Sequence, residues 1–238
     1  MSQAEPRRTV HCQDALAWLQ EPTALKGASV VTSLPDVSEL GLDLSTWKKW
    51  FTDTAALILE RTPPDAVAIF YQTDVKKEGQ WVDKGYLVHA AAERVGARLL
   101  WHKIVCRRPA GTVTFGRPAY SHMQCYSRGL TLDLSRSTAD VLPDAGEMNW
   151  SRAMGVNACL VACRFIRDHT RSHVVVDPFC GKGTVLAVAN ALGLDAVGVE
   201  LSRKRAKAAR GMRVVLGDDG KPHTGAPTAP AADDDGSS

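Results

Sequence analysis

A glycine-rich turn near the C-terminal end of the chain carries the residues best suited to bind a small ligand. It follows Val174–Val176, an apolar β-branched run that predicts a buried parallel strand. Pro178 cannot donate a ladder hydrogen bond, so we expect the strand to end near Asp177. Gly181 and Gly183 then permit a tight turn and a close approach of the backbone to a ligand, before a helix begins.

The chemistry around this turn indicates a nucleoside with a cationic end. The next predicted strand, Ala196–Val199, ends at Glu200, where a carboxylate can accept hydrogen bonds from both hydroxyls of a ribose. Asp177 would repel a pyrophosphate but attract an ammonium. The glycine spacings of dinucleotide and phosphate loops are absent, since Lys182 lies between the two glycines. S-adenosylmethionine (SAM) matches, because it has a ribose, a sulfonium and an amino-acid end.

The run Asp-Pro-Phe-Cys-Gly-Lys-Gly-Thr at 177–184, followed by Val-Gly-Val-Glu at 197–200, resembles the cofactor motif of SAM-dependent methyltransferases. It is most similar to the group that methylates amino groups of DNA and RNA bases. The resemblance implies an α/β, Rossmann-like fold with a seven-strand mixed sheet, one antiparallel strand and helices on both faces. The cofactor-binding residues that it implies are Asp14, Asp177, Phe179, Cys180, Gly181, Gly183, Thr184 and Glu200.

A second motif, Ser33-Leu34-Pro35-Asp36, follows the predicted strand Ser29–Thr32. Amino-methyltransferases use Asp/Asn/Ser-Pro-Pro-aromatic here, so the resemblance makes Ser33, Pro35 and Asp36 the candidate catalytic residues. Ser33 can accept a hydrogen bond from an amine, but Asp36 replaces the aromatic that stacks on the base. Asp36 could bind the Watson–Crick edge of guanine, act as a base, or be a turn or cap residue.

The order of the motifs resembles that of permuted methyltransferases. If the strands are numbered by their place in that sheet, the chain runs from the third to the seventh and then to the first and second, so the catalytic turn precedes the cofactor motif. Gln13-Asp14-Ala15 would place Asp14 at the adenine, although Asp14 could equally be a helix N-cap. By the same resemblance, residues 149–152 would line the methionine end of the cofactor.

Two basic segments are candidates for substrate contact. Gln72–Gly85 predicts a polar loop whose cations and Trp81 could hold a phosphate backbone and stack a base, or be merely solvated. Arg107–Pro118 predicts a loop that is either a substrate lid or an ordinary connection. Tyr71, Trp81 or Tyr120 could supply the missing stack. The candidate substrate-binding residues are Tyr71, Lys76, Lys77, Trp81, Arg107, Arg108 and Arg117.

Composition sets the remaining expectations. The 238-residue chain carries a net charge of +3, but residues 217–238 hold five Asp and one Lys, hence −4, so the remaining body carries +7. We expect a flexible N-terminus at 1–8, a methyltransferase domain at 9–216 and a disordered acidic tail at 217–238. The six scattered cysteines favour buried free thiols over a metal site. The chain shows neither a signal-peptide pattern nor a membrane-spanning run, which predicts a cytoplasmic protein.

These observations predict a SAM-dependent methyltransferase that acts on a base in RNA, for example tRNA or rRNA. RNA is favoured over DNA because the chain has no room for a separate recognition domain, and a partner protein could supply recognition. The alternatives are a DNA amino-methyltransferase, a catalytically silent subunit that binds SAM or RNA, and an enzyme that methylates a small molecule.

Overall fold

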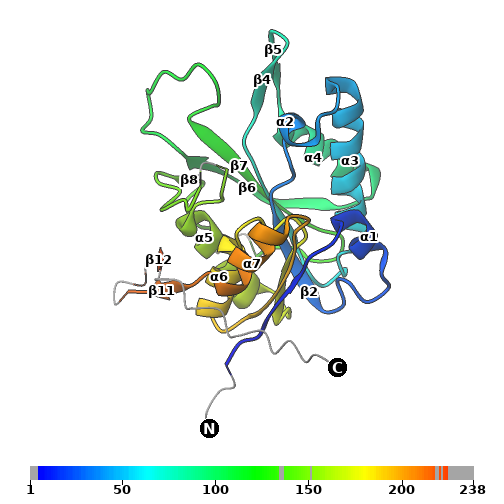
Figure 1. Ribbon diagram of the computed structural model, residues 1–238, viewed down its shortest axis with the longest axis vertical. Coiled ribbons are helices and arrows are strands. Elements are labelled where there is room, and N and C mark those ends of the chain that lie inside the picture. The colour runs from blue at the N-terminus through cyan, green and yellow to red at the C-terminus, as the bar shows by residue number, and fades with distance from the viewer. Residues whose placement is uncertain (1–4, 134–136, 151, 218–219, 221, 225–238) are drawn as a thin grey trace, which may run out of the picture.

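The computed structural model describes residues 5–133, 137–150, 152–217, 220 and 222–224. Its centre is an eight-stranded mixed sheet (Figure 1). In spatial order, the strands are β1 (Arg8–His11), β10 (Asp195–Val199), β9 (Val174–Asp177), β2 (Ala28–Thr32), β3 (Ala68–Gln72), β7 (Tyr120–Ser127), β6 (Arg98–Cys106) and β8 (Val141–Leu142).

The strand order confirms the permuted topology. β9 and β10, the first and second strands of a methyltransferase sheet, lie between β1 and β2, although they come last in the chain. β7 is antiparallel to both of its neighbours, and the other pairings in the sheet are parallel. The sheet has eight strands rather than the expected seven. The additional strand, β8, is two residues long and pairs with β6 at one end of the strand order.

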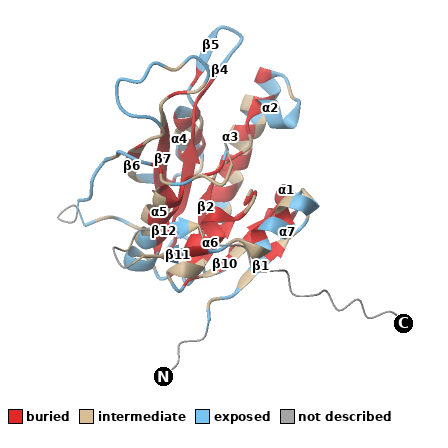
Figure 2. Ribbon diagram, turned by 60° about the vertical axis from the view of Figure 1, so that its left-hand side comes forward, coloured by how far each residue is buried: buried red, intermediate tan, exposed pale blue. Residues whose placement is uncertain are grey.

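Helices cover both faces of the sheet, which leaves its central strands β9, β2, β3 and β7 largely buried (Figure 2). One face packs against α1 (Ala15–Gln20), α3 (Leu44–Arg61) and α4 (Lys84–Arg94), and the other against α5 (Val156–His169), α6 (Thr184–Ala191) and α7 (Arg203–Gly211). The periodicity of α3 dictates its orientation, because Trp47, Phe51 and Ile58 recur on one helical face and are completely buried. None of the helices in the described part of the chain is both long and apolar enough to cross a bilayer.

Seven strands run in the same direction, so their carboxyl ends meet at one edge of the sheet. These strands are β1, β2, β3, β6, β8, β9 and β10, and we call this edge the carboxyl edge. The catalytic turn follows β2, the glycine-rich turn follows β9, and Glu200 follows β10. The basic segments after β3 and β6 leave from the same edge. The topology therefore gathers every candidate site segment on one side of the molecule.

Several sequence-based boundaries need correction. The expected polar loop Gln72–Gly85 contains a β-hairpin, β4 (Val75–Lys77) and β5 (Gln80–Val82), which projects beyond the sheet in Figure 1. Arg8 belongs to β1, although a flexible segment was expected up to this residue. At the other end, β12 (Pro222–Thr224) pairs with β11 (Val214–Leu216), within the segment expected to be disordered. Residues 225–238 of that predicted tail lie outside the described part of the chain.

Candidate functional site

The cofactor motif and the catalytic turn line one cavity of about 290 Å³ at the carboxyl edge, which we call the carboxylate cavity. It is lined by most of the residues that the sequence predicted for cofactor and catalysis. These are Asp14, Ser33, Pro35, Asp177, Phe179, Cys180, Gly181, Thr184 and Glu200. Gly183 and Asp36 do not line it. Ser33 and Asp177 are far apart in the sequence but lie at the same edge of the sheet, because β2 and β9 are adjacent parallel strands.

Asp177 is held rigidly with one carboxylate oxygen available to a ligand. Its Oδ1 accepts hydrogen bonds from Thr32 Oγ1 at 2.8 Å and from the backbone N of Phe179 at 3.1 Å. Among the described residues, Oδ2 has no such bond. Burial raises the pKa of Asp177 to about 7, and the nearby charge of Glu200 adds to this rise. An ammonium placed at Oδ2 would stabilise the ionised form of this buried carboxyl.

Glu200 has the same arrangement at the end of β10. Its Oε1 accepts from the backbone N of Ser202 at 2.7 Å and from Arg205 Nη2 at 2.9 Å, so Oε2 remains for a hydroxyl donor. Asp14 is the N-cap of α1 and accepts from the backbone N of Ala17 at 2.9 Å. It also lines the cavity, so the capping role predicted for it coexists with a position suited to ligand contact.

The small residues of the motif have different tasks. Gly181 lies in the cavity wall at a φ of 54°, a conformation that favours glycine. Gly183 instead faces α7, where an added Cβ would lie 2.8 Å from the Cα of Ala209. Cys180 packs close to Gly198, and burial raises the pKa of its thiol. Within this turn, Gly181 therefore faces the cavity, and Gly183 allows close packing against α7.

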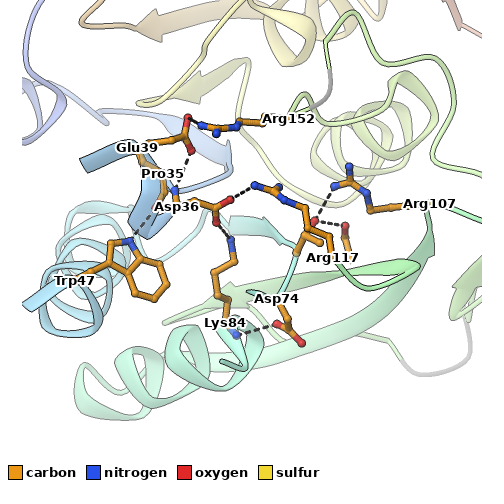
Figure 3. Close-up of polar contacts among 11 residues, drawn as sticks. Pro35, Asp36, Glu39, Trp47, Asp74, Lys84, Arg107, Arg117 and Arg152 are labelled. Carbon is orange, nitrogen blue, oxygen red and sulfur yellow. Dashed lines mark hydrogen bonds and ion pairs between the residues drawn. The ribbon is translucent and has the colours of Figure 1, made fainter. Parts of the chain in front are cut away.

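The catalytic turn exposes Ser33 and Pro35 to the cavity but withdraws Asp36. The Pro35 carbonyl accepts from Trp47 Nε1 at 3.1 Å, which ties the turn to α3. Asp36, the N-cap of α2 (Val37–Leu40), is 4% exposed. Its carboxylate accepts from Lys84 Nζ at 2.5 Å and also from Arg117 (Figure 3). With both oxygens engaged, Asp36 is a cap and an ion-pair anchor, so this geometry does not support the expected contact with a base.

The predicted substrate residues lie in different environments. Tyr71 is only 2% exposed and belongs to the core, so it offers no stacking face in this conformation. Lys76 and Lys77 are exposed on β4. The Trp81 ring is fixed by two contacts. Its Nε1 donates to Asp74 Oδ2 at 3.0 Å, and Lys76 Nζ lies 5.0 Å from the ring centroid. The β4–β5 hairpin therefore presents a partly exposed aromatic and two cations.

A second cavity, of about 510 Å³, opens beside the first, and we call it the arginine cavity. The loop 107–119 between β6 and β7 supplies Arg107, Arg108 and Arg117, and Arg152 completes the set. Arg152 lines both cavities, so the two are contiguous. Arg107 donates to Thr73 Oγ1 at 2.9 Å, and Arg152 pairs with Glu39 at 2.9 Å.

Sequence reasoning missed one residue that lines the carboxylate cavity and the burial of a second residue close to it. Trp50 of α3 lines the carboxylate cavity and meets Phe179 edge-on at 6.2 Å between ring centroids. Lys84 was counted among the loop cations but is buried beneath Asp36. Trp150 and Arg152, which the family resemblance placed near the cofactor, do line the carboxylate cavity, and Ser151 lies outside the described residues.

One group of side chains in the described part of the chain has metal-like spacing. The ligand atoms of Asp74, Asp83 and His122 all lie within 4.8 Å of one another. The two acids already accept hydrogen bonds from the protein, Asp74 from Trp81 and Asp83 from the backbone N of Tyr86. This group therefore acts as a support for the β4–β5 hairpin.

Comparisons with known proteins support this assignment of the fold. Residues 161–211 match the family model described as DNA methylase. A protein from Thermus thermophilus assigned as a DNA modification methylase shares 19% identity at a TM-score of 0.64, over 85% of this chain and 92% of that one. The PvuII DNA methyltransferase, which is cytosine-N4-specific, shares 14% at 0.66, over 86% and 87%. No curated protein matches the chain in sequence.

The Thermus protein has also been solved in complex with SAM, at 18% identity and a TM-score of 0.63. The carboxylate cavity fits that cofactor, because it offers a rigid carboxylate at each of two strand ends and a glycine wall between them. The predicted resemblance to permuted amino-methyltransferases is confirmed. This chain has the SAM-dependent methyltransferase fold, and its residues 161–211 carry the sequence pattern of the DNA methylase family.

Proposed function

We propose that the protein transfers a methyl group from SAM to an exocyclic amino group of a base in nucleic acid. One observation carries the proposal: Ser33 and Pro35 of the catalytic turn line the same cavity as Asp177 and Glu200 of the cofactor motif. An acceptor bound at Ser33 and a cofactor bound at the two carboxylates would share one enclosed space. That proximity is the main requirement of an in-line displacement.

The side chains of the carboxylate cavity would have separate roles in binding the cofactor, orienting the acceptor and excluding water. Asp177 would hold the amino-acid end of the cofactor through an ammonium, and Glu200 would hold its ribose. When bound, SAM would supply an electrophilic methyl group on a sulfonium, and the amine nitrogen would take this methyl in exchange for a proton released to solvent. Ser33 Oγ would accept a hydrogen bond from the amine, which orients its lone pair toward the methyl. Trp50, Phe179 and Trp150 would exclude water.

DNA is the better-supported substrate. The matched family is described as DNA methylase, and the similar solved structures carry names of DNA-modifying proteins. The preference for RNA rested on the absence of a separate recognition domain, and the comparisons do not support it. Within the proposal, DNA therefore comes first and RNA is the alternative that the experiment below separates.

A catalytically silent subunit that binds SAM and nucleic acid is the second candidate. It is favoured by the state of Asp36, which stands in the aromatic position of the tetrapeptide and is engaged by Lys84 and Arg117. Such a subunit would bind both ligands without turnover, whereas the proposed enzyme needs only Ser33 and the cavity geometry for transfer.

The test is transfer of labelled methyl from SAM to unmodified DNA and RNA pools. The wild-type protein should label DNA, and Ser33→Ala should lower the rate about tenfold or more, since a positioned hydrogen bond to the reacting group is lost. Ser38→Ala is the matched control, because Ser38 is exposed on α2 and lines neither cavity. Label in RNA alone would overturn the substrate. No label in either pool despite SAM binding would favour the silent subunit.

A further inference from the structure

We propose that the arginine cavity is a subsite for a backbone phosphate of the strand that presents the acceptor base, and that Asp36 builds this subsite by fixing Arg117. The inference rests on the proposed function and deepens it, since it names the part of the substrate that the second cavity takes. It also gives a role to Asp36, which stands where amino-methyltransferases have an aromatic residue.

The charge of the cavity selects an anion. Its lining contains four guanidinium groups and no carboxylate, with Thr114 and Met148 among the other lining residues. Guanidinium groups match phosphate oxygens with two parallel hydrogen bonds, and they are less strongly hydrated than ammonium groups. Arg108 is exposed and donates no side-chain hydrogen bond to another described residue, so it can turn toward a phosphate without breaking a contact. A volume of about 510 Å³ leaves space for a phosphodiester and part of its sugar.

The anchoring of Arg117 preorganises this site. Asp36 is 4% exposed and Lys84 2%, so the pair that supports Arg117 is buried beneath the loop (Figure 3). The Arg117 side chain is 34% exposed and lines the cavity, which leaves part of its guanidinium accessible to a ligand. A guanidinium already held by a buried carboxylate loses little side-chain entropy when it binds a phosphate. Asp36 is thus a positioning residue.

The contiguity of the two cavities relates the phosphate to the reaction. Arg152 lines both, and its partner Glu39 belongs to α2, the helix that begins after the catalytic turn. Pro35 of that turn lines the carboxylate cavity. A strand whose phosphate lies among the four arginines would therefore have its nearby base within reach of Ser33. The basic loop, in this arrangement, is the feature that aligns the strand with the cofactor.

The first test measures strand binding without catalysis. A fluorescein-labelled single-stranded DNA of mixed sequence is titrated with the full chain at several salt concentrations, and affinity is read by anisotropy. Arg108→Gln should weaken binding about three- to tenfold and reduce the slope of log affinity against log salt by about 0.7, the value for one phosphate contact on a single strand. Arg108→Lys should keep the slope because it keeps the charge.

Arg171→Gln is the matched control, because Arg171 is exposed just before β9, at the opposite edge of the sheet from both cavities. An equal effect of Arg108→Gln and Arg171→Gln would overturn the subsite, since it would mean that only net charge matters. Calorimetry with SAM keeps the two proposals apart. A wild-type protein that binds the strand in this Arg108-dependent way but neither binds SAM nor transfers methyl would refute the proposed function and leave the phosphate subsite standing.

The second test separates positioning from bulk charge. The double variant Asp36→Asn with Lys84→Met removes one negative and one positive charge, so a bulk electrostatic effect would leave strand affinity unchanged. If Asp36 fixes Arg117, strand affinity should fall about three- to tenfold. Wild-type strand affinity in the folded double variant would overturn the role given to Asp36. If that variant fails to fold, Arg117→Lys tests the same anchor, because it keeps the charge but loses the planar fork; unchanged affinity would again count against the proposal.

Discussion

The carboxylate cavity and the arginine cavity lie side by side at the same edge of the sheet, yet they are built in different ways. The first takes the two carboxylates proposed to hold the cofactor from one short motif and from the residue that follows the next strand. The second collects arginines from the loop 107–119 and from Arg152, and depends on a buried anchor on another segment. A local motif therefore specifies the cofactor side, whereas tertiary contacts specify the substrate side.

The largest expected effect breaks the anchor of the arginine cavity. Asp36→Asn leaves the Lys84 ammonium buried without its carboxylate, so we expect the free energy of unfolding to fall by about 3–5 kcal/mol. Adding Lys84→Met should restore most of it, because no unpaired charge remains. Urea denaturation followed by circular dichroism measures both. Asp53→Asn, at a surface carboxylate that pairs with Lys49 and Arg94, should cost less than about 1 kcal/mol. Equal losses at the two sites would contradict a buried anchor.

The next effect belongs to the carboxylate cavity. Asp177→Asn should weaken SAM binding by about 10- to 100-fold, because a charge-assisted hydrogen bond to the ammonium is lost. Isothermal titration calorimetry gives the affinity. Asp195→Asn, at the amino end of β10 in contact with Arg7, should bind SAM like the wild type. Unchanged SAM affinity in Asp177→Asn would mean that the cofactor lies elsewhere.

A fall in pH should also weaken the binding of SAM in the carboxylate cavity. The pKa of Asp177 is raised to about 7 by burial, so the carboxyl becomes neutral as the pH falls through that value. SAM affinity should then fall by up to about tenfold per pH unit below 7. The stability of the ligand-free protein should change in the opposite direction. Because the pKa of Asp177 is raised, its contribution to the free energy of unfolding is largest below about pH 4 and becomes smaller as the pH rises through 7. Asp177→Asn should bind SAM with a flat pH profile in this range, and a wild-type-like profile would assign the titration to another group.

The smallest effect is expected at Glu200. Glu200→Gln keeps an acceptor for a ribose hydroxyl but loses its charge and its ion pair with Arg205, so SAM affinity should fall only about three- to tenfold. A competition assay with adenosine should show the same loss, since the contact is to the ribose. A Glu200→Gln variant that weakens SAM but not adenosine would place the ribose at another residue.

The difference between the cavities also explains what the sequence could predict. The turn at 177–184 and Glu200 were predicted because strand, glycine and acid positions in a βαβ unit are set by neighbours along the chain, whereas the permuted strand order was implied by the family resemblance. The hairpin β4–β5 was missed because a short polar segment has no clear strand period. The β12 strand was missed because it lies in a tail that has no apolar periodicity, beyond its partner β11.

The cap position of Asp36 was among the alternatives read from the sequence, but its ion pairs could not be predicted, for a different reason. Its position in the tetrapeptide indicated catalysis, but whether a carboxylate faces a substrate or a buried lysine depends on residues that are 48 and 81 positions away. Lys84 likewise carries no signal of burial, since lysine is usually exposed. Tyr71 stands at the end of a strand, where only the packing of β7 and α5 decides whether its ring is open.

The most direct test of the separate roles of the two cavities is to titrate two variants with each of two ligands. SAM is titrated by calorimetry and single-stranded DNA by anisotropy into Asp177→Asn and into Arg108→Gln. We predict that Asp177→Asn loses SAM affinity and keeps strand affinity, while Arg108→Gln loses strand affinity and keeps SAM affinity. If Asp177→Asn weakens the strand as much as SAM, or if Arg108→Gln weakens neither ligand, then the two cavities do not divide cofactor and substrate in this way.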